Sequence, residues 1–189
     1  MKAYLIPGNG EDLKSRDYQA VLDIYKELGY EPHFVPIKWN YKTIDDWVDQ
    51  VNQQLSKKDI ENSLLSGFSF GSMIALAIAA QVNPNKLLLF SLSPYFKEDM
   101  PLKPSWEKWA GKRKTANFKR FSMDKLATRV SCPTQVFIGS KEVSRYPNMN
   151  MRAKEAAKRI PGSKLVIVGG VGHDVGDPKY VASIMKELK

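Results

Sequence analysis

A serine flanked by glycines is the strongest chemical signal in this sequence. Residues 67–71 read Gly-Phe-Ser-Phe-Gly, between an apolar run at 63–67 and a longer apolar run at 73–82. In that context the pattern predicts a sharp turn from a strand into a buried helix, which lifts Ser69 above the sheet as a nucleophile. The backbone N–H of Phe70, at the start of the helix, would then face a developing oxyanion. The pentapeptide alone also fits a capping serine in a glycine turn, so the prediction depends on further residues.

A serine hydroxyl needs a base to take its proton, and the sequence holds two histidines. His33 lies early in an expected strand, away from the carboxyl end where ligands bind in open parallel sheets, and is interpreted as structural. His173 follows the last expected strand, in a glycine-rich loop at the carboxyl edge. We therefore take His173 as the candidate general base.

The imidazole in turn needs an acid that fixes its tautomer and stabilises its positive charge. Glu142 follows the fifth expected strand at the same edge and is favoured for this role. Asp174 is adjacent to His173 in the chain, so its carboxylate is poorly placed to reach a ring nitrogen. Glu98 and Asp99 follow the fourth expected strand and remain alternatives, because this geometry tolerates more than one chain position for the acid.

The elements that must position these residues alternate along the chain. Short apolar runs predict strands at 2–6, 32–37, 63–67, 86–92, 134–139 and 164–168. Helical spacing of apolar residues and capping residues predict helices at 15–28, 43–55, 73–82, 148–160 and 177–188. This alternation predicts a three-layer α/β/α sandwich with a mostly parallel six-stranded sheet.

The segment 94–127, called the insertion below, interrupts the alternation within an otherwise single expected domain over 1–189. Residues 93–135 hold ten basic and four acidic side chains, most of the net charge of +9. Candidate substrate-pocket residues in the insertion are the aromatic side chains of Tyr95, Phe96, Trp106 and Trp109. The charge would suit an acidic protein partner or an acyl group on an acidic carrier. Alternatively, the aromatic residues only pin the insertion to the core and the charges keep it soluble.

Composition excludes several other classes. Cys132 is the single cysteine, so a disulfide scaffold is excluded. The longest apolar run, 73–80, is far shorter than the ~20 residues of a membrane span, and no signal-peptide core precedes Pro7. A cytoplasmic protein is therefore expected. No residues have metal-ligand spacing, and no metal or cofactor is expected.

Nucleotide and nucleic-acid binding are not expected either. The turn at 8–15 resembles a phosphate-binding loop, but Leu13 replaces the glycine that lets the backbone wrap the phosphates. The same turn fails as a dinucleotide-binding fingerprint, and no known nucleic-acid-binding module accompanies the basic insertion.

Together these residues resemble the α/β-hydrolase family. The resemblance rests on the serine turn at 67–71, the turn at 139–142 and the Gly172-His173 pair, and it covers nearly the whole chain apart from the insertion. It implies a serine hydrolase of the carboxylesterase or thioesterase type, with an acyl-enzyme on the serine. It also implies that the Asn9 backbone N–H is a second oxyanion donor, and that the insertion forms a lid.

The sequence departs from the family pattern in three ways. The family's usual first two strands have no counterpart, the acid is Glu rather than the commoner Asp, and Pro7 stands where the family has His. A minimal, divergent member is therefore expected. The alternative is a binding protein that keeps the fold without turnover, because a fold does not fix a function.

Overall fold

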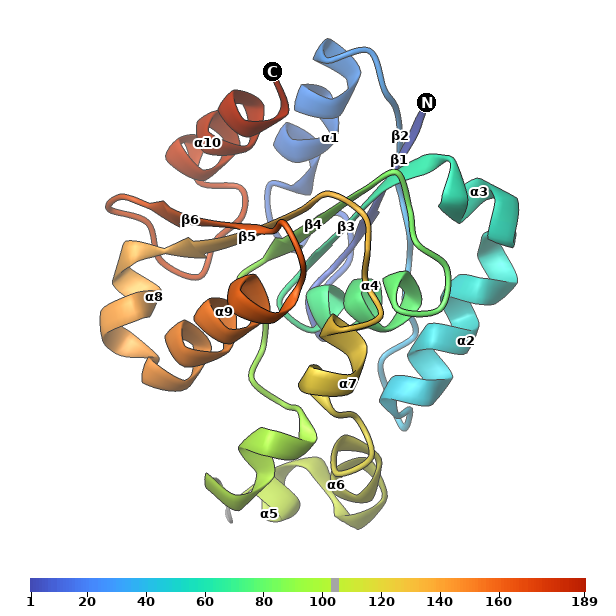
Figure 1. The fold of residues 1–189 in the computed structure, drawn as a ribbon, viewed down its shortest axis with the longest axis vertical. Coiled ribbons are helices and arrows are strands. Elements are labelled where there is room, and N and C mark those ends of the chain that lie inside the picture. The colour runs from blue at the N-terminus through green and yellow to red at the C-terminus, as the bar shows by residue number, and fades with distance from the viewer. Residues whose placement is uncertain (103–105) are drawn as a thin grey trace.

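A six-stranded sheet forms the centre of the structure, a computed structural model that describes residues 1–102 and 106–189 (Figure 1). Within these ranges, the side chains at 101, 102, 106 and 109 are not described. The strands are β1 (Lys2–Ile6), β2 (Glu31–Phe34), β3 (Ser63–Phe68), β4 (Lys86–Phe90), β5 (Thr134–Gly139) and β6 (Lys164–Val168). Their order is β2-β1-β3-β4-β5-β6, and every neighbouring pair is parallel. All strands therefore end at one edge.

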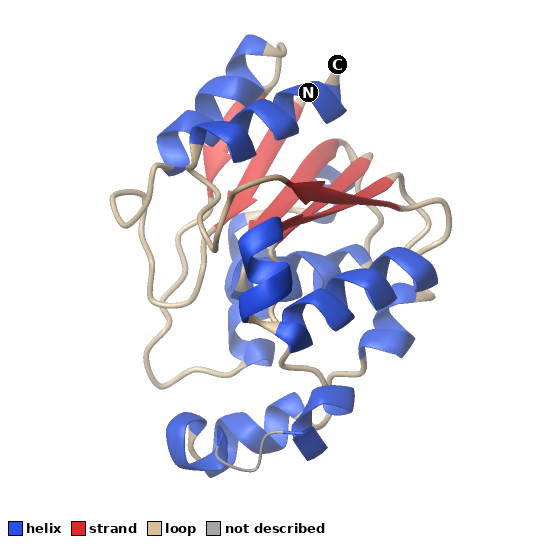
Figure 2. Ribbon diagram, turned by 90° about the vertical axis from the view of Figure 1, so that its left-hand side faces the viewer, coloured by secondary structure: helices blue, strands red, loops and turns tan. Residues whose placement is uncertain are grey.

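Helices cover both faces of the sheet, which confirms the predicted three-layer sandwich (Figure 2). One face carries α1 (Tyr18–Glu27) and α10 (Pro178–Leu188), and the other carries α2 (Ile44–Gln54), α4 (Phe70–Ala79) and α9 (Pro147–Arg159). Successive side chains of a strand point to opposite faces of the sheet. Leu5 therefore lies on the face covered by α1 and α10, and Tyr4 lies on the face covered by α2, α4 and α9. Burial on both faces explains why the inner strands β1, β3 and β4 consist mainly of apolar residues.

The helix starts follow from local side chains. Thr43 caps α2 in a reciprocal pair with Asp46, where the sequence allowed either Thr43 or Asp45 as the cap. Asp177 precedes Pro178 at the start of α10, as the sequence predicts. In contrast, α4 has no capping side chain, and all ten of its residues are buried. It begins three residues before the expected apolar run, directly after Ser69.

Short helices account for most differences from the sequence prediction. The structure adds α3 (Lys57–Glu61) and α8 (Ser140–Arg145), and α8 holds Glu142 where a loop was expected. The insertion contains a 3₁₀ segment η1 (Lys97–Leu102) and three helices, α5 (Trp106–Ala110), α6 (Lys112–Phe118) and α7 (Met123–Ala127). Strands β2 and β4 end sooner than expected, β2 before Pro36 and β4 before Ser91, whose φ of 49° departs from the extended range.

The insertion lies beyond the carboxyl edge of the sheet, where α5 and α6 project from the rest of the molecule (Figures 1 and 2). Phe118 attaches α6 to the core, with its ring centroid 6.1 Å from that of Phe70 and 5.5 Å from that of Tyr95. The side chain of Asn117 accepts the Ile44 backbone N–H at 2.9 Å, which ties α6 to the start of α2.

A buried ion pair fixes the base of the insertion. The Asp99 carboxylate in η1 accepts a hydrogen bond from Arg152 Nη2 in α9 at 2.7 Å, and the two side chains are 0% and 1% exposed. Removing one partner leaves an uncompensated buried charge, so Arg152→Met is expected to lower the free energy of unfolding by ~3–5 kcal/mol. Urea unfolding monitored by circular dichroism measures this loss.

The double variant Asp99→Asn/Arg152→Met serves as the control for this prediction. It removes both charges and keeps an acceptor for the Phe96 N–H, which donates to Asp99 at 3.0 Å, so it is expected to recover most of the lost stability. A double variant as unstable as the single one would contradict the assignment of the loss to unpaired charge.

Candidate functional site

The turn between β3 and α4 holds Ser69 in an unusual backbone conformation. Its φ is 56° and its ψ is −115°, which non-glycine residues rarely adopt. A Cβ on Gly67 would lie 2.2 Å from the Gly71 carbonyl oxygen, and one on Gly71 would lie 2.3 Å from the Ile6 carbonyl oxygen. Both flanking positions therefore require glycine, which gives the pentapeptide pattern its physical reason.

Three side chains from separate elements form one hydrogen-bonded chain. Ser69 Oγ lies 3.2 Å from His173 Nε2, and His173 Nδ1 lies 2.6 Å from Glu142 Oε1. The serine precedes α4, the histidine lies in the loop after β6, and the glutamate lies in the first turn of α8. In this arrangement the imidazole can accept the serine proton at one nitrogen while the other faces a carboxylate.

The Glu142 carboxylate is fully buried and held from its far side. Its Oε2 accepts the Gly139 backbone N–H at 2.7 Å and the Ser91 hydroxyl at 2.8 Å. The Tyr180 hydroxyl lies 3.2 Å from Ser91 Oγ, and burial raises the pKa of Tyr180, so the phenol stays protonated. These donors occupy Oε2 and leave Oε1 for the histidine.

A cavity of about 400 Å³ opens onto the serine. One wall comes from the segment after β4, including Ser93 and Tyr95, and another from residues 145–149 at the junction of α8 and α9. Of the expected pocket residues, Tyr95 lines this cavity. Phe96 does not: it is buried in the core, with the Arg152 guanidinium 5.8 Å from its ring centroid. The expected pocket residues Trp106 and Trp109 have side chains outside the described part of the structure.

No protein-family model matches this chain. No curated protein matches it either. Solved structures do match. Mouse alpha/beta hydrolase domain-containing protein 10 aligns over 99% of this chain and 87% of its own, with a TM-score of 0.77 and 16% identity.

Est1E from Butyrivibrio proteoclasticus, solved with ferulic acid, aligns over 100% of this chain and 87% of its own, with a TM-score of 0.75 and 14% identity. Bromoperoxidase from Bacillus anthracis aligns over 100% and 91%, with a TM-score of 0.70 and 14% identity. The chain has the α/β-hydrolase fold. At these identities the likeness establishes the fold alone.

In this α/β-hydrolase fold, the turns expected to supply oxyanion donors lie side by side. Strands β1 and β3 are neighbours, and Ile6 pairs with Gly67 in their register. The turn that carries Asn9 therefore follows β1 next to the turn that carries Ser69 and Phe70. The roles of the Asn9 and Phe70 N–H groups remain predictions.

The other candidate acids and the second histidine interact with residues outside the site. Glu98 accepts the Met123 backbone N–H at 3.0 Å at the start of α7, and Asp99 pairs with Arg152. His33 lies on the outer strand β2, where its Nε2 is 2.9 Å from Glu31 Oε1. The structure thus brings only Glu142, of these acids, to His173.

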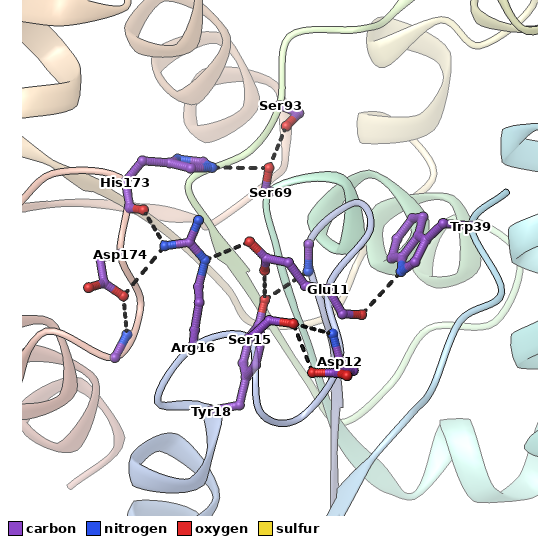
Figure 3. Close-up of polar contacts among 12 residues, drawn as sticks. Glu11, Asp12, Ser15, Arg16, Tyr18, Trp39, Ser69, Ser93, His173 and Asp174 are labelled. Atoms are coloured by element: carbon purple, nitrogen blue, oxygen red, sulfur yellow. Dashed lines mark hydrogen bonds and ion pairs between the residues drawn. The ribbon is translucent and has the colours of Figure 1, made fainter. Parts of the chain in front are cut away.

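Ser93 belongs to the site, and the sequence analysis missed it. Its hydroxyl is 3.0 Å from that of Ser69, and the residue is 4% exposed (Figure 3). If Ser69 donates to His173, then Ser93 is left to donate to Ser69 Oγ. The available signal was its place directly after β4, at the edge that also holds the other site residues.

Within residues 1–102 and 106–189, no cluster of three or more His, Cys, Asp or Glu side chains is placed to hold a metal ion. The same ranges contain no helix long and apolar enough to cross a bilayer.

Proposed function

We propose that this protein is a serine hydrolase that cleaves a carboxylic ester or thioester through an acyl-enzyme on Ser69. The observation that carries the proposal is the hydrogen-bonded chain from Ser69 through His173 to Glu142, open to a cavity. A nucleophile, a base and an orienting acid in this order are what acyl transfer by serine requires.

The geometry supports two successive steps. Ser69 Oγ attacks the substrate carbonyl while His173 Nε2 takes its proton, and the leaving alcohol or thiol departs with that proton. Water then attacks the acyl-enzyme, gives a proton to His173, and the acid is released as Ser69 recovers its own. The N–H groups of Phe70 and Asn9 would stabilise the negative oxygen in both steps.

A substrate panel tests this function. Wild type and Ser69→Ala would be compared on acyl esters and thioesters of increasing chain length, with initial rates as the readout. Turnover by wild type alone supports the proposal. Binding without turnover by either protein would instead support the non-catalytic alternative.

We further propose that the substrate carries an anionic group at its end away from the scissile bond. Arg145 lines the cavity at the end of α8, one turn after Glu142, and the described lining residues include no carboxylate. The remaining walls are largely apolar, with Phe70, Tyr95 and Met149 among them. A short acyl chain that ends in a carboxylate matches this combination.

The basic insertion offers a separate site for an acidic partner or carrier. Lys112, Arg113 and Lys114 line another groove together with residues 41–43, and Arg113 pairs with Asp46 at 3.2 Å. An acidic protein that delivers the acyl group would contact this groove, whereas a free substrate would contact Arg145.

The two anion sites predict different mutant effects. Arg145→Gln is expected to raise KM about fivefold for the 4-nitrophenyl half-ester of glutarate, as the loss of an exposed ion pair would, and to leave 4-nitrophenyl valerate unchanged. Reversing Lys112, Arg113 and Lys114 to Glu should affect only a carrier-bound substrate. Arg129→Gln removes the same charge at another exposed position and serves as the control.

Equal KM changes for the charged and the neutral ester would contradict the role of Arg145. Salt offers a second measurement, because screening weakens an exposed ion pair. Turnover of the half-ester at low substrate concentration should fall as salt rises, while turnover of the valerate should not.

A further inference from the structure

Arg16 connects the turn after β1 with the loop that carries the histidine (Figure 3). Its Nη1 donates to the His173 backbone carbonyl oxygen at 2.8 Å and lies 3.7 Å from Asp174 Oδ1. Its Nε donates to Glu11 Oε1 at 2.7 Å. One guanidinium group thus holds two turns that are far apart in the sequence.

Glu11 extends this connection to the residue before Asn9. Its Oε2 accepts the Tyr18 hydroxyl, and the Tyr18 oxygen accepts the Gly8 backbone N–H at 2.8 Å. Burial is the main cause that raises the pKa of Tyr18, and the hydrogen bond to Glu11 is the second. The phenol therefore stays protonated and donates its proton to Glu11. A Cβ on Gly8 would lie 2.6 Å from Glu11 Oε2, so this contact also requires the glycine.

The ring of Phe68 packs against both the Arg16 guanidinium and the His173 imidazole. The Arg16 guanidinium carbon lies 4.9 Å from the Phe68 ring centroid, and the His173 ring centroid lies 4.6 Å from it. The Arg16 and Glu11 side chains are 25% and 18% exposed, so solvent only partly screens their charges. A chain of direct contacts therefore runs from Gly8 to the imidazole.

From these contacts we infer that Arg16 and Glu11 are positioning residues that hold the expected oxyanion turn and the histidine loop in one geometry. The inference rests on the proposed function, in which His173 moves the proton and Asn9 faces the oxyanion. Arg16 touches no reacting atom and acts through the His173 carbonyl and through Glu11. A misplacement of about 1 Å can cost about a hundredfold in rate, so a small shift of either turn matters.

The pair also balances charge beside the imidazole. Other charged groups near His173 are Glu142 from α8, Asp174 in its own loop and Arg145 across the cavity. Removing Glu11 alone leaves Asp174 as the remaining carboxylate partner of Arg16, at 3.7 Å, so the added net positive charge disfavours the imidazolium. Removing Arg16 alone leaves Glu11 and Asp174 uncompensated and favours it.

The test uses kcat, KM and pH profiles for a neutral ester, 4-nitrophenyl butyrate. Arg16→Gln, Arg16→Lys and Glu11→Gln are each expected to lower kcat about 10- to 100-fold with little change in KM. Arg16→Lys keeps the charge but loses the planar fork that serves both partners at once. Arg159→Gln, which removes a surface ion pair with Asp124, is the matched control and should retain kcat.

The pH profile separates positioning from a general loss of stability. The acidic limb of kcat/KM reports protonation of the base in the free enzyme. Glu11→Gln should move that limb to lower pH and Arg16→Gln to higher pH, each on the order of 0.5 pH unit. The double variant should return the limb towards its wild-type position while kcat stays low. A loss of stability alone would give no shifts of opposite sign.

The outcomes also distinguish this inference from the function on which it rests. If wild type hydrolyses the ester and Ser69→Ala does not, but the Arg16 and Glu11 variants keep both kcat and the acidic limb, only the positioning role is overturned. If wild type neither turns over esters nor reacts at Ser69 with a fluorophosphonate, both proposals are overturned. A thermal melt of each variant establishes that the measured protein is folded.

Discussion

Ser69→Ala is expected to lower kcat by about four to six orders of magnitude while the protein stays folded. The substitution removes the proposed attacking atom, Oγ, which lies 3.2 Å from His173 Nε2. Ser69 is 8% exposed, but alanine keeps the Cβ and removes a single atom, so the packing around this turn changes little. The measurement is kcat for 4-nitrophenyl butyrate together with a thermal melt.

Two neighbouring serines make this prediction specific. Ser93→Ala removes a buried hydroxyl 3.0 Å from Ser69 Oγ and is expected to cost no more than about tenfold, the value of one hydrogen bond. The Ser72 hydroxyl lies within hydrogen-bond distance of the carbonyl oxygens of Gly67 and Phe90, so it is held within the core. A fluorophosphonate probe should therefore label Ser69. Labelling at Ser72, or at no serine, would contradict the assignment of the nucleophile.

Most strands were predictable from the sequence because strands buried in the sheet are short runs of apolar residues. Strands β1, β5 and β6 have the bounds that their apolar runs predict. Burial on both faces explains this for the inner strands β1 and β5, whereas the outer strand β6 is partly exposed. Helices α2 and α10 were predictable for a second reason, because Thr43 and Asp177 mark their starts. In these elements local sequence and tertiary packing agree.

The insertion helices were not predictable in this way. Helices α5, α6 and α7 have five to seven residues, too few for an apolar period to emerge. They are stable through distant contacts instead, such as the packing of Phe118 against Phe70 and the bond from Ile44 to Asn117. The prediction that Phe96 lines the substrate pocket was wrong for a related reason. The sequence alone does not distinguish an aromatic residue that lines a cavity from one that is buried in the core.

The three residues of the hydrogen-bonded chain could be predicted from their positions after parallel strands. Parallel strands end at one edge, so chemistry-bearing residues directly after strands were expected together, and Ser69, Glu142 and His173 are in hydrogen-bond contact there. The connection through Arg16 and Glu11 had no such signal. It depends on how the turn after β1 folds against the histidine loop, which no local spacing encodes.

Substitution of the acid that orients His173 is the second change expected to have a large effect on activity. Glu142→Gln is expected to lower kcat by about 10³- to 10⁴-fold. The Gly139 N–H and the Ser91 hydroxyl both donate to Oε2, so the glutamine carbonyl oxygen would take that position. The amide NH₂ would then face His173 Nδ1 as a donor. This arrangement favours the tautomer with its proton on Nε2, which cannot accept the proton of Ser69.

Flipping the amide does not rescue the variant, because the NH₂ group would then meet the fixed Gly139 N–H. Glu98→Gln is the matched control, since that carboxylate accepts the Met123 N–H at the start of α7 and lies outside the hydrogen-bonded chain. It should change kcat by less than about threefold, because the Glu98 side chain contacts the start of α7 and not the site. Measurement of kcat and thermal stability for both variants checks the assignment. A greater loss for Glu98→Gln than for Glu142→Gln would place the acid after β4 and contradict the geometry from which the mechanism is derived.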